Sequence, residues 1–155
     1  MKVRAQGMAL SPEPGWEVRI RVRPADPGAA DGRPRPVLHA ATVPLPEGRG
    51  DFGGGVTALL GPEDVFLTLF EYDPAASTTA LFATRGRPTP IPPDFSPSQL
   101  QRTLPGQSGR QWFFREGGRA FCLYVVLGSH ARRVPLVRRA AALLATLDLD
   151  PGDGS

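Results

Sequence analysis

The feature that most constrains the fold of this chain is an apolar stretch over residues 119–128. In a β-strand, alternate side chains point to opposite faces. One face of this stretch carries Phe121, Leu123, Val125 and Leu127, and the other carries Ala120, Cys122, Tyr124 and Val126. A strand that is apolar on both faces must be covered on both, so the pattern predicts a central strand between two layers.

Other segments supply neighbours for this strand. Residues 64–72 form a second strongly apolar run, and the aromatic residues 112–114 lead through Gly117 and Gly118 into the first, as in a hairpin. Apolar and charged residues alternate over residues 16–23, which predicts a half-buried strand. Shorter strands are expected over residues 37–43 and 78–84, the latter paired with residues 64–72 as a hairpin.

Three segments have helical character. Residues 135–147 place their leucines on one side of a helix, and Pro135 fits near a helix start. Ser96, Pro97 and Gln99 form a capping signal that predicts a short helix from residue 97 to about residue 104. Residues 56–60 are expected to form a short helix ended by Gly61 and Pro62.

Together these elements predict an α/β protein of the α+β type, with a mainly antiparallel sheet of about five to seven strands. The C-terminal helix is expected to cover the central strand. At 155 residues the chain is one domain, residues 1–155, with residues 1–10 and 149–155 frayed. Either Met1 or Met8 is compatible with being the start.

Composition excludes several classes of function. The formal net charge is only +3 despite a pI of 9.7, which gives little long-range field to attract nucleic acid. Cys122 is the only cysteine and cannot form an intramolecular disulfide, which favours a cytoplasmic location. No apolar run reaches the roughly 18 residues of a membrane span, and residues 1–10 lack the apolar core of a secretory signal.

Neither a metal nor a cofactor is predicted. His39 has no His, Cys or acidic residue at ligand spacing. The Asp-Phe-Gly-Gly-Gly sequence of residues 51–55 precedes an expected helix but lacks the Gly-Lys-Ser/Thr of a phosphate loop, so a plain loop is expected there.

Catalytic candidates are few. Cys122 lies in a buried run and is expected to be an inert core thiol. His130, beside Ser129 between the last strand and the last helix, is the best acid–base candidate. The acidic residues that bracket residues 64–72 offer a second alternative if two of them meet across a cleft: Glu63, Asp64, Glu71 and Asp73.

Arginine side chains define the candidate interaction surface. Arg19, Arg21 and Arg23 form a row on one face of the strand at residues 16–23, and Arg138 and Arg139 lie on the polar side of the last helix. Such a row either contacts an anionic partner or is a solvated face that discourages edge-to-edge aggregation.

The C-terminal half resembles the PsbP-like superfamily. The resemblance covers residues 64–74, residues 118–130 and the closing residues 137–148, with their Ala-Leu-Leu-Ala-Thr-Leu ending. It implies a long apolar strand followed by a helix across an antiparallel sheet. It also implies an accessory function, since known members are mostly non-enzymatic photosystem subunits, import factors, secretion chaperones and lipoproteins.

We therefore expect a non-catalytic cytoplasmic accessory domain that binds a protein partner. One alternative is a small-molecule-binding domain, with a pocket between the sheet and the proline-rich loops at residues 24–36 and 85–94. Another is a small enzyme that uses His130 or an acidic pair. The sequence does not specify the partner or the oligomeric state.

Overall fold

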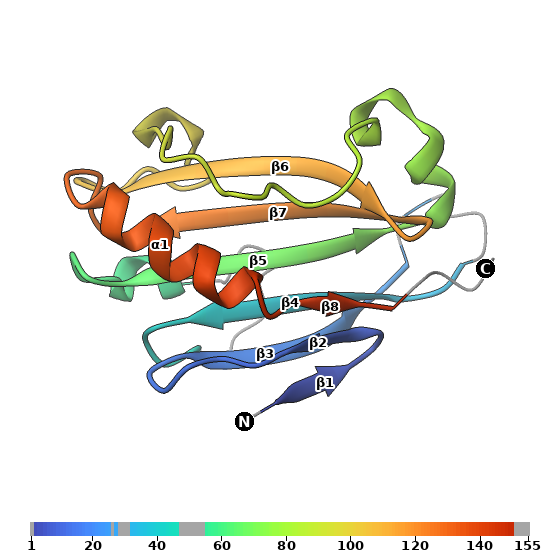
Figure 1. The fold of residues 1–155 in the computed structure, drawn as a ribbon, viewed down its shortest axis with the longest axis horizontal. Helices are drawn as coiled ribbons and strands as arrows, with labels where there is room; N and C mark the ends of the chain where they lie inside the picture. Colours follow the sequence, from blue (N-terminus) through green and yellow to red (C-terminus); the bar gives the residue numbers. More distant parts are fainter. Residues whose placement is uncertain (1, 26, 28–31, 47–54, 151–155) are drawn as a thin grey trace.

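The central strand predicted from the sequence is β7 (Arg119–Leu127), and all of its residues are buried. The structure is a computed structural model that describes residues 2–25, 27, 32–46 and 55–150. β7 pairs antiparallel with β5 (Val65–Tyr72) on one side and with β6 (Ser108–Glu116) on the other. β4 (Arg35–Ala41) and β3 (Glu17–Arg23) follow β5, which gives a five-stranded sheet of order β3-β4-β5-β7-β6 (Figure 1).

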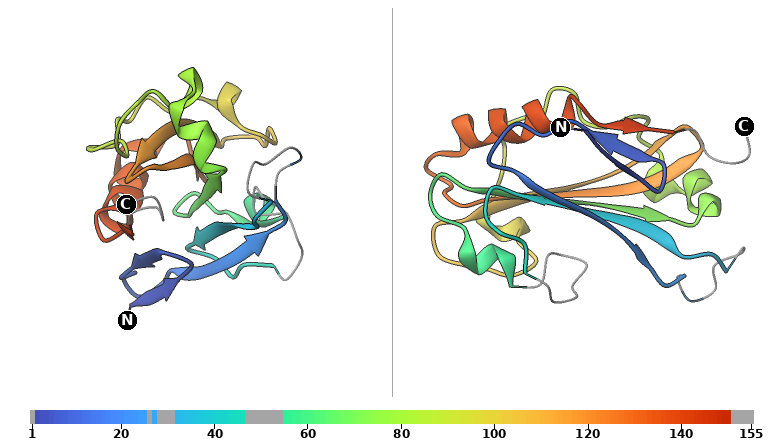
Figure 2. Two further views of the ribbon diagram at one scale, coloured as in Figure 1. Left: turned by 90° about the vertical axis from the view of Figure 1, so that its right-hand side faces the viewer. Right: turned by 90° about the horizontal axis from the view of Figure 1, so that it is seen from below.

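A second layer covers one face of this sheet. α1 (Arg133–Leu144) lies across β5 and β7, as Figure 1 shows. In the same layer, β1 (Val3–Ala5), β2 (Met8–Leu10) and β8 (Asp148–Leu149) form a three-stranded antiparallel sheet (Figure 2). Met8, Leu10 and Leu136 share one core with the apolar odd-numbered residues of β7, Phe121 to Leu127. The predicted α+β domain, with the C-terminal helix covering the central strand, is confirmed.

Irregular segments cover the opposite face. They contain the 3₁₀ helices η1 (Val56–Leu59), η2 (Pro74–Thr78), η3 (Ala80–Phe82) and η4 (Pro97–Gln99). Near η1, Val56 packs with Phe66 and Tyr124. Near η3, the Phe82 ring lies 5.2 Å from that of Tyr72 and 5.7 Å from that of Phe113. Both faces of β7 are thus buried, as its two apolar sets of side chains require.

The expectation of frayed ends is wrong for the residues that the structure describes. β1 and β2 form a hairpin whose two-residue turn has positive φ at Gln6 (54°) and Gly7 (74°), as in a type I′ turn. Met8, Ala9 and Leu10 are all buried, and Asp148 and Leu149 pair with β2. Residues 151–155 lie outside the described part of the chain.

Two further expectations are corrected. No strand forms at residues 78–84, because β4 and β7 already pair with both edges of β5, and the chain forms η2 and η3 instead. The helix expected at residues 97–104 is only the single turn η4. Ser96 caps it through the Ser98 N–H as expected, but Leu100 is already extended (φ −77°, ψ 137°). The glycine loop expected at residues 51–54 lies outside the described residues.

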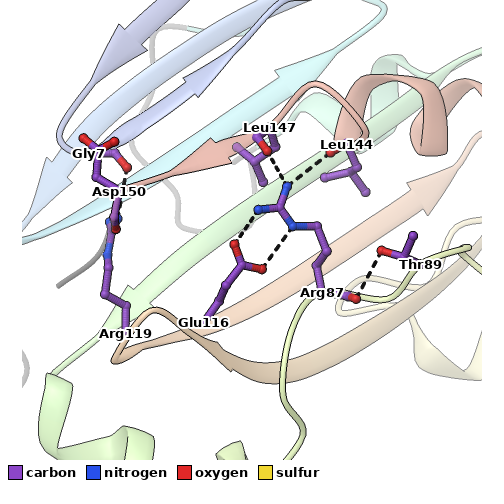
Figure 3. Close-up of polar contacts among 8 residues, drawn as sticks. All are labelled: Gly7, Arg87, Thr89, Glu116, Arg119, Leu144, Leu147 and Asp150. Carbon is purple, nitrogen blue, oxygen red and sulfur yellow. Dashed lines mark hydrogen bonds and ion pairs between the residues drawn. The ribbon is translucent and has the colours of Figure 1, made fainter. Parts of the chain in front are cut away.

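Arg119 ties the two layers together. Its guanidinium forms a bidentate ion pair with Glu71 of β5, with Nη2–Oε1 and Nε–Oε2 distances of 2.6 and 2.9 Å. Nη1 donates to the carbonyl oxygens of Gly7 and Asp150 at 3.0 and 2.8 Å (Figure 3). The two paired side chains are each 7% exposed, so this ion pair is sealed between the sheets.

Arg87 plays a related part at the end of α1. Its guanidinium pairs with both oxygens of Glu116, and Nη1 donates to the carbonyl oxygens of Leu144 and Leu147 (Figure 3). The Leu144 carbonyl belongs to the last turn of α1, where a positive charge is favoured by the helix dipole, and Leu147 follows the helix by three residues. Arg87 thereby fixes the C-terminal end of α1 to the β6–β7 hairpin.

Replacing Arg119 with Met is expected to destabilise the protein by about 3–5 kcal/mol, because the Glu71 carboxylate is left buried without its cation. Urea denaturation measures this loss. The double variant Arg119→Met, Glu71→Leu should be more stable than Arg119→Met alone, since it buries no unpaired charge.

Arg132→Met is the control for this prediction. It breaks an ion pair with Glu63 whose side chains are 53% and 63% exposed, and it should cost less than about 1 kcal/mol. An equally small loss for Arg119→Met would show that the buried pair does not hold the layers together.

Candidate functional site

β3 lies at one edge of the five-stranded sheet, and its two faces differ in chemistry. Val18 and Ile20 pack against the core beneath the second layer. Because side chains alternate along a strand, Arg19, Arg21 and Arg23 lie on the face opposite α1. The row of arginines predicted from the sequence is thus present at an edge of the sheet.

Arg19 and Arg23 contact backbone, acidic and aromatic groups close to the edge. Arg19 donates to the Pro46 carbonyl oxygen at 2.8 Å and lies 3.5 Å from a carboxylate oxygen of Glu17. Arg23 donates to the Glu71 carbonyl oxygen at 3.0 Å, and its guanidinium lies over the Tyr72 ring at 5.3 Å. Contacts of this kind orient the guanidinium groups of Arg19 and Arg23 along the edge of the sheet.

The backbone of β3 exposes hydrogen-bonding groups along this edge. The N–H of Thr42 donates to the Val65 carbonyl oxygen. The backbone N–H and C=O groups of even-numbered residues in β4 therefore face β5, and those of odd-numbered residues face β3. Arg19 and Arg21 of β3 lie opposite the odd-numbered residues His39 and Val37 of β4. The backbone groups of these two arginines therefore form their hydrogen bonds with β4. The N–H and C=O groups of Val18, Ile20 and Val22 consequently point outward.

The other edge of the sheet is covered. Arg115 of β6 exchanges backbone hydrogen bonds with the segment at Thr84 and Gly86, and Gly109 exchanges two with Ser96. The proline-rich residues 85–94 therefore run along β6 and shield it. In the described part of the chain, no strand pairs with the outer side of β3, so the two edges of the sheet differ.

Arg138 and Arg139 are not part of this edge. They lie on the exposed side of α1, in the layer on the other side of the sheet. Arg139 donates to the Glu63 carbonyl oxygen at 2.6 Å, and its guanidinium lies 6.0 Å from the centre of the Trp16 ring. The five arginines predicted as one surface thus lie on two.

His130 lies between β7 and α1, as the sequence indicates. Its N–H donates to the Gly106 carbonyl oxygen at 2.7 Å, and its Nδ1 is buried without a hydrogen-bond partner. Ser129, its neighbour, accepts from the Arg132 N–H through Oγ. The Ser129 hydroxyl therefore serves the first turn of α1, and it is not the partner of the imidazole Nδ1.

The acidic residues around β5 are held in structural contacts. Glu71 pairs with Arg119, Glu63 with Arg132, Asp64 accepts from the Thr42 hydroxyl at 2.8 Å, and Asp73 caps η2. Glu63 and Asp64 precede β5, while Glu71 and Asp73 lie at its far end, about 23 Å away at 3.3 Å per residue. No group of three metal-ligating side chains occurs among the described residues.

A polar row crosses the face of the sheet opposite α1. The strand register places Arg19 opposite His39, His39 opposite Thr68, Thr68 opposite Tyr124 and Tyr124 opposite Gln111. His39, Thr68 and Tyr124 are 8%, 0% and 1% exposed, and apolar clusters flank the row on both sides. The row was missed in the sequence because each strand contributes one residue, and only the register aligns them.

Burial raises the pKa of Cys122, which lies next to this row, and of Tyr124, which belongs to it. It raises the pKa of the Cys122 thiol to about 11, and a hydrogen bond from Gln111 opposes this shift only in part. Burial likewise raises the pKa of Tyr124, whose hydroxyl accepts a hydrogen bond from the Gln101 N–H at 2.8 Å. A thiol of this kind is a poor nucleophile at neutral pH.

No protein-family model matches this chain, and neither a curated protein nor a solved structure matches it. None of the helices in the described ranges has the length and apolar content needed to cross a lipid bilayer. What the protein does must therefore be inferred from the geometry of the described residues.

Cys122 is expected to react with a chromogenic thiol reagent at pH 8 at least about 100-fold more slowly in the native protein than in urea. Raising the pKa from 9.0 to about 11 lowers the thiolate fraction by that factor, and burial slows access of the reagent further.

The same pKa shift makes stability depend on pH. Between about pH 9 and pH 11 the native protein keeps the Cys122 proton while the unfolded chain loses it, so the free energy of unfolding falls as the pH rises through this range. Cys122→Ala should lack this part of the alkaline loss. Fast labelling of the native protein would contradict the prediction.

Proposed function

We propose that this protein is a non-catalytic accessory domain that binds a protein partner along the outer edge of β3. The proposal rests on a difference between the two edges of the five-stranded sheet: in the described residues, the β6 edge is covered and the β3 edge is not. β6 is shielded by residues 85–94, whereas Val18, Ile20 and Val22 direct their backbone groups away from the sheet. Proteins commonly cover or blunt such an edge unless another chain uses it.

Two further observations support this proposal. The resemblance of residues 64–74, 118–130 and 137–148 to the PsbP-like superfamily points the same way, since most known members are accessory proteins. The single cysteine, with its buried thiol, is the basis for a cytoplasmic location. On α1, Arg138 and Arg139 offer a separate basic surface for a second contact.

Val22→Pro tests the docking edge. Val22 is 47% exposed, and its N–H points outward, so proline removes a donor from the edge without removing one from the ladder with β4. A partner captured from the source organism by the wild-type protein should be lost with Val22→Pro. Val22→Thr keeps the N–H and should retain the partner.

Amide hydrogen exchange gives a second readout that needs no variant. Partner binding should slow exchange at Val18, Ile20 and Val22 more than at other exposed amides. A partner that binds Val22→Pro as well as the wild type and leaves these three amides unprotected would show that docking lies elsewhere.

The polar row favours a second candidate function, which is small-molecule binding. Buried polar groups between two apolar clusters are typical of ligand sites, where a few polar atoms orient an otherwise apolar ligand. The described partners of the row offer a competing account, since Arg19 and Tyr124 also anchor the backbone of covering segments at Pro46 and Gln101.

A thermal-shift panel of metabolites tests this second candidate. A ligand at 100 times its Kd should stabilise the protein by about 2.7 kcal/mol. Gln111→Met keeps the side-chain volume but removes the amide, so it should weaken the effect of a ligand bound at the row. Two results would count against this function. Either no compound in the panel stabilises the protein, or each stabilising compound shifts the wild type and Gln111→Met equally.

A further inference from the structure

The apolar core beneath the second layer is incompletely covered at β3. Val18 and Ile20 of β3 lie opposite Ala40 and Leu38 of β4. The two β4 residues are 0% and 1% exposed. Their neighbours on β3 are only partly buried, and Val22 is 47% exposed. The core therefore loses its cover within one strand of the edge.

The second layer has a partly buried apolar residue at the same side. Val3 of β1 packs against the same core as Val18 and Ile20, and it is only partly buried. β1 is an outer strand of the small sheet, as β3 is of the large one, and both lie at the lower side of the molecule in Figure 1. Side chains that enter from this side would meet Val3 in one layer and β3 in the other.

We infer that the partner is an extended segment with aliphatic side chains at every second position. It adds to β3 as a sixth strand, and its aliphatic side chains complete the core between the two layers. This inference rests on the function proposed above and specifies the partner at the same edge.

Hydrogen bonding sets the conformation of the partner. Outward-facing backbone groups recur at every second residue of β3, at Val18, Ile20 and Val22. A helix satisfies its own backbone and cannot use these groups, whereas an extended segment pairs with all of them. The partner is therefore extended along β3.

The alternation of side chains sets the pattern of the partner. Residues directly opposite each other on neighbouring strands share a face of the sheet. Partner residues opposite Val18, Ile20 and Val22 therefore point toward the second layer, where aliphatic side chains would bury apolar surface. The partner residues between them lie on the other face of the sheet and take no part in this core.

A second copy of β3 cannot supply these side chains. Its Val18 and Ile20 already pack against the core of their own chain. A segment that is unfolded before it binds has its aliphatic side chains available, and it becomes ordered on binding. Together with the function proposed above, this identifies the occupant as an otherwise unfolded segment of another protein.

Two uncharged peptides of identical composition test the inference. One alternates three valines with threonines, and the other has the three valines in a block. The alternating peptide should bind at least about tenfold more tightly by titration calorimetry, since only it directs all three valines toward the second layer. Because the peptide carries no charge, its affinity should be the same at about 50 and about 200 mM salt.

Substitutions at Val22 and Val3 separate the backbone contribution from that of the core. Val22→Pro should abolish binding of the alternating peptide, whereas Val22→Ile keeps the N–H and the apolar surface and should retain it. Val3→Thr should weaken binding by about fivefold, because a hydroxyl replaces a methyl group between the layers. Val134→Thr is the matched control, since Val134 is 46% exposed on α1, and it should leave the affinity unchanged.

Amide exchange of the wild type gives a readout that does not depend on how well a variant folds. Addition of the alternating peptide should slow exchange at Val18, Ile20 and Val22, and the blocked peptide at the same concentration should not.

Three results would overturn the inference, and they separate it from the proposed function. Loss of a native partner with Val22→Pro, together with equal or absent binding of the two peptides, would keep the docking edge but reject an aliphatic strand. Binding of the alternating peptide that Val22→Pro leaves unchanged would place the peptide away from β3. A dimer in sedimentation that Val22→Pro dissociates would identify a second copy as the occupant.

Discussion

The arrangement of layers depends on the guanidinium of Arg119. It neutralises Glu71 on the neighbouring strand and, with its remaining donors, binds the turn between β1 and β2 and the residue after β8. The two segments of the small sheet are also joined to each other, since the Asp150 N–H donates to the Gly7 carbonyl oxygen. The bonds of Arg119 tie them to the large sheet in one orientation, which the non-directional apolar contacts between the layers cannot do. Gly7 makes the approach possible, since a Cβ there would lie 3.1 Å from Nη1, and its φ of 74° suits glycine.

Charge and backbone geometry act together at the outer side of β3. An uncovered strand is a hazard because any extended chain can pair with it. Three arginines lie on one face of β3, and charged side chains on an edge strand discourage pairing with further chains.

The sequence predicted those elements whose pattern lies within a single stretch of residues, and it missed features that depend on residues far apart. β7, β5 and α1 were predictable because residues within each element carry its pattern, and the arginines of β3 were visible for the same reason. β2 was missed because three residues cannot establish a period, and the strand expected at residues 78–84 failed because both sides of β5 were already occupied. The Arg119–Glu71 pair joins residues 48 positions apart, and the polar row draws one residue from each of five strands.

A contact between residues far apart in the sequence has a consequence for biosynthesis. Arg4 and Asp150 are 146 positions apart, yet their side chains meet at 3.5 Å beside the small sheet. At roughly 5–20 residues per second, a ribosome delivers the second of these residues about 7–30 seconds after the first. The N-terminal hairpin, with the apolar Met8 and Leu10, has no β8 to pair with during that interval. Completion of this fold therefore waits for the synthesis of residues 148–149, and a nascent chain stalled before residue 148 retains an unpaired apolar hairpin.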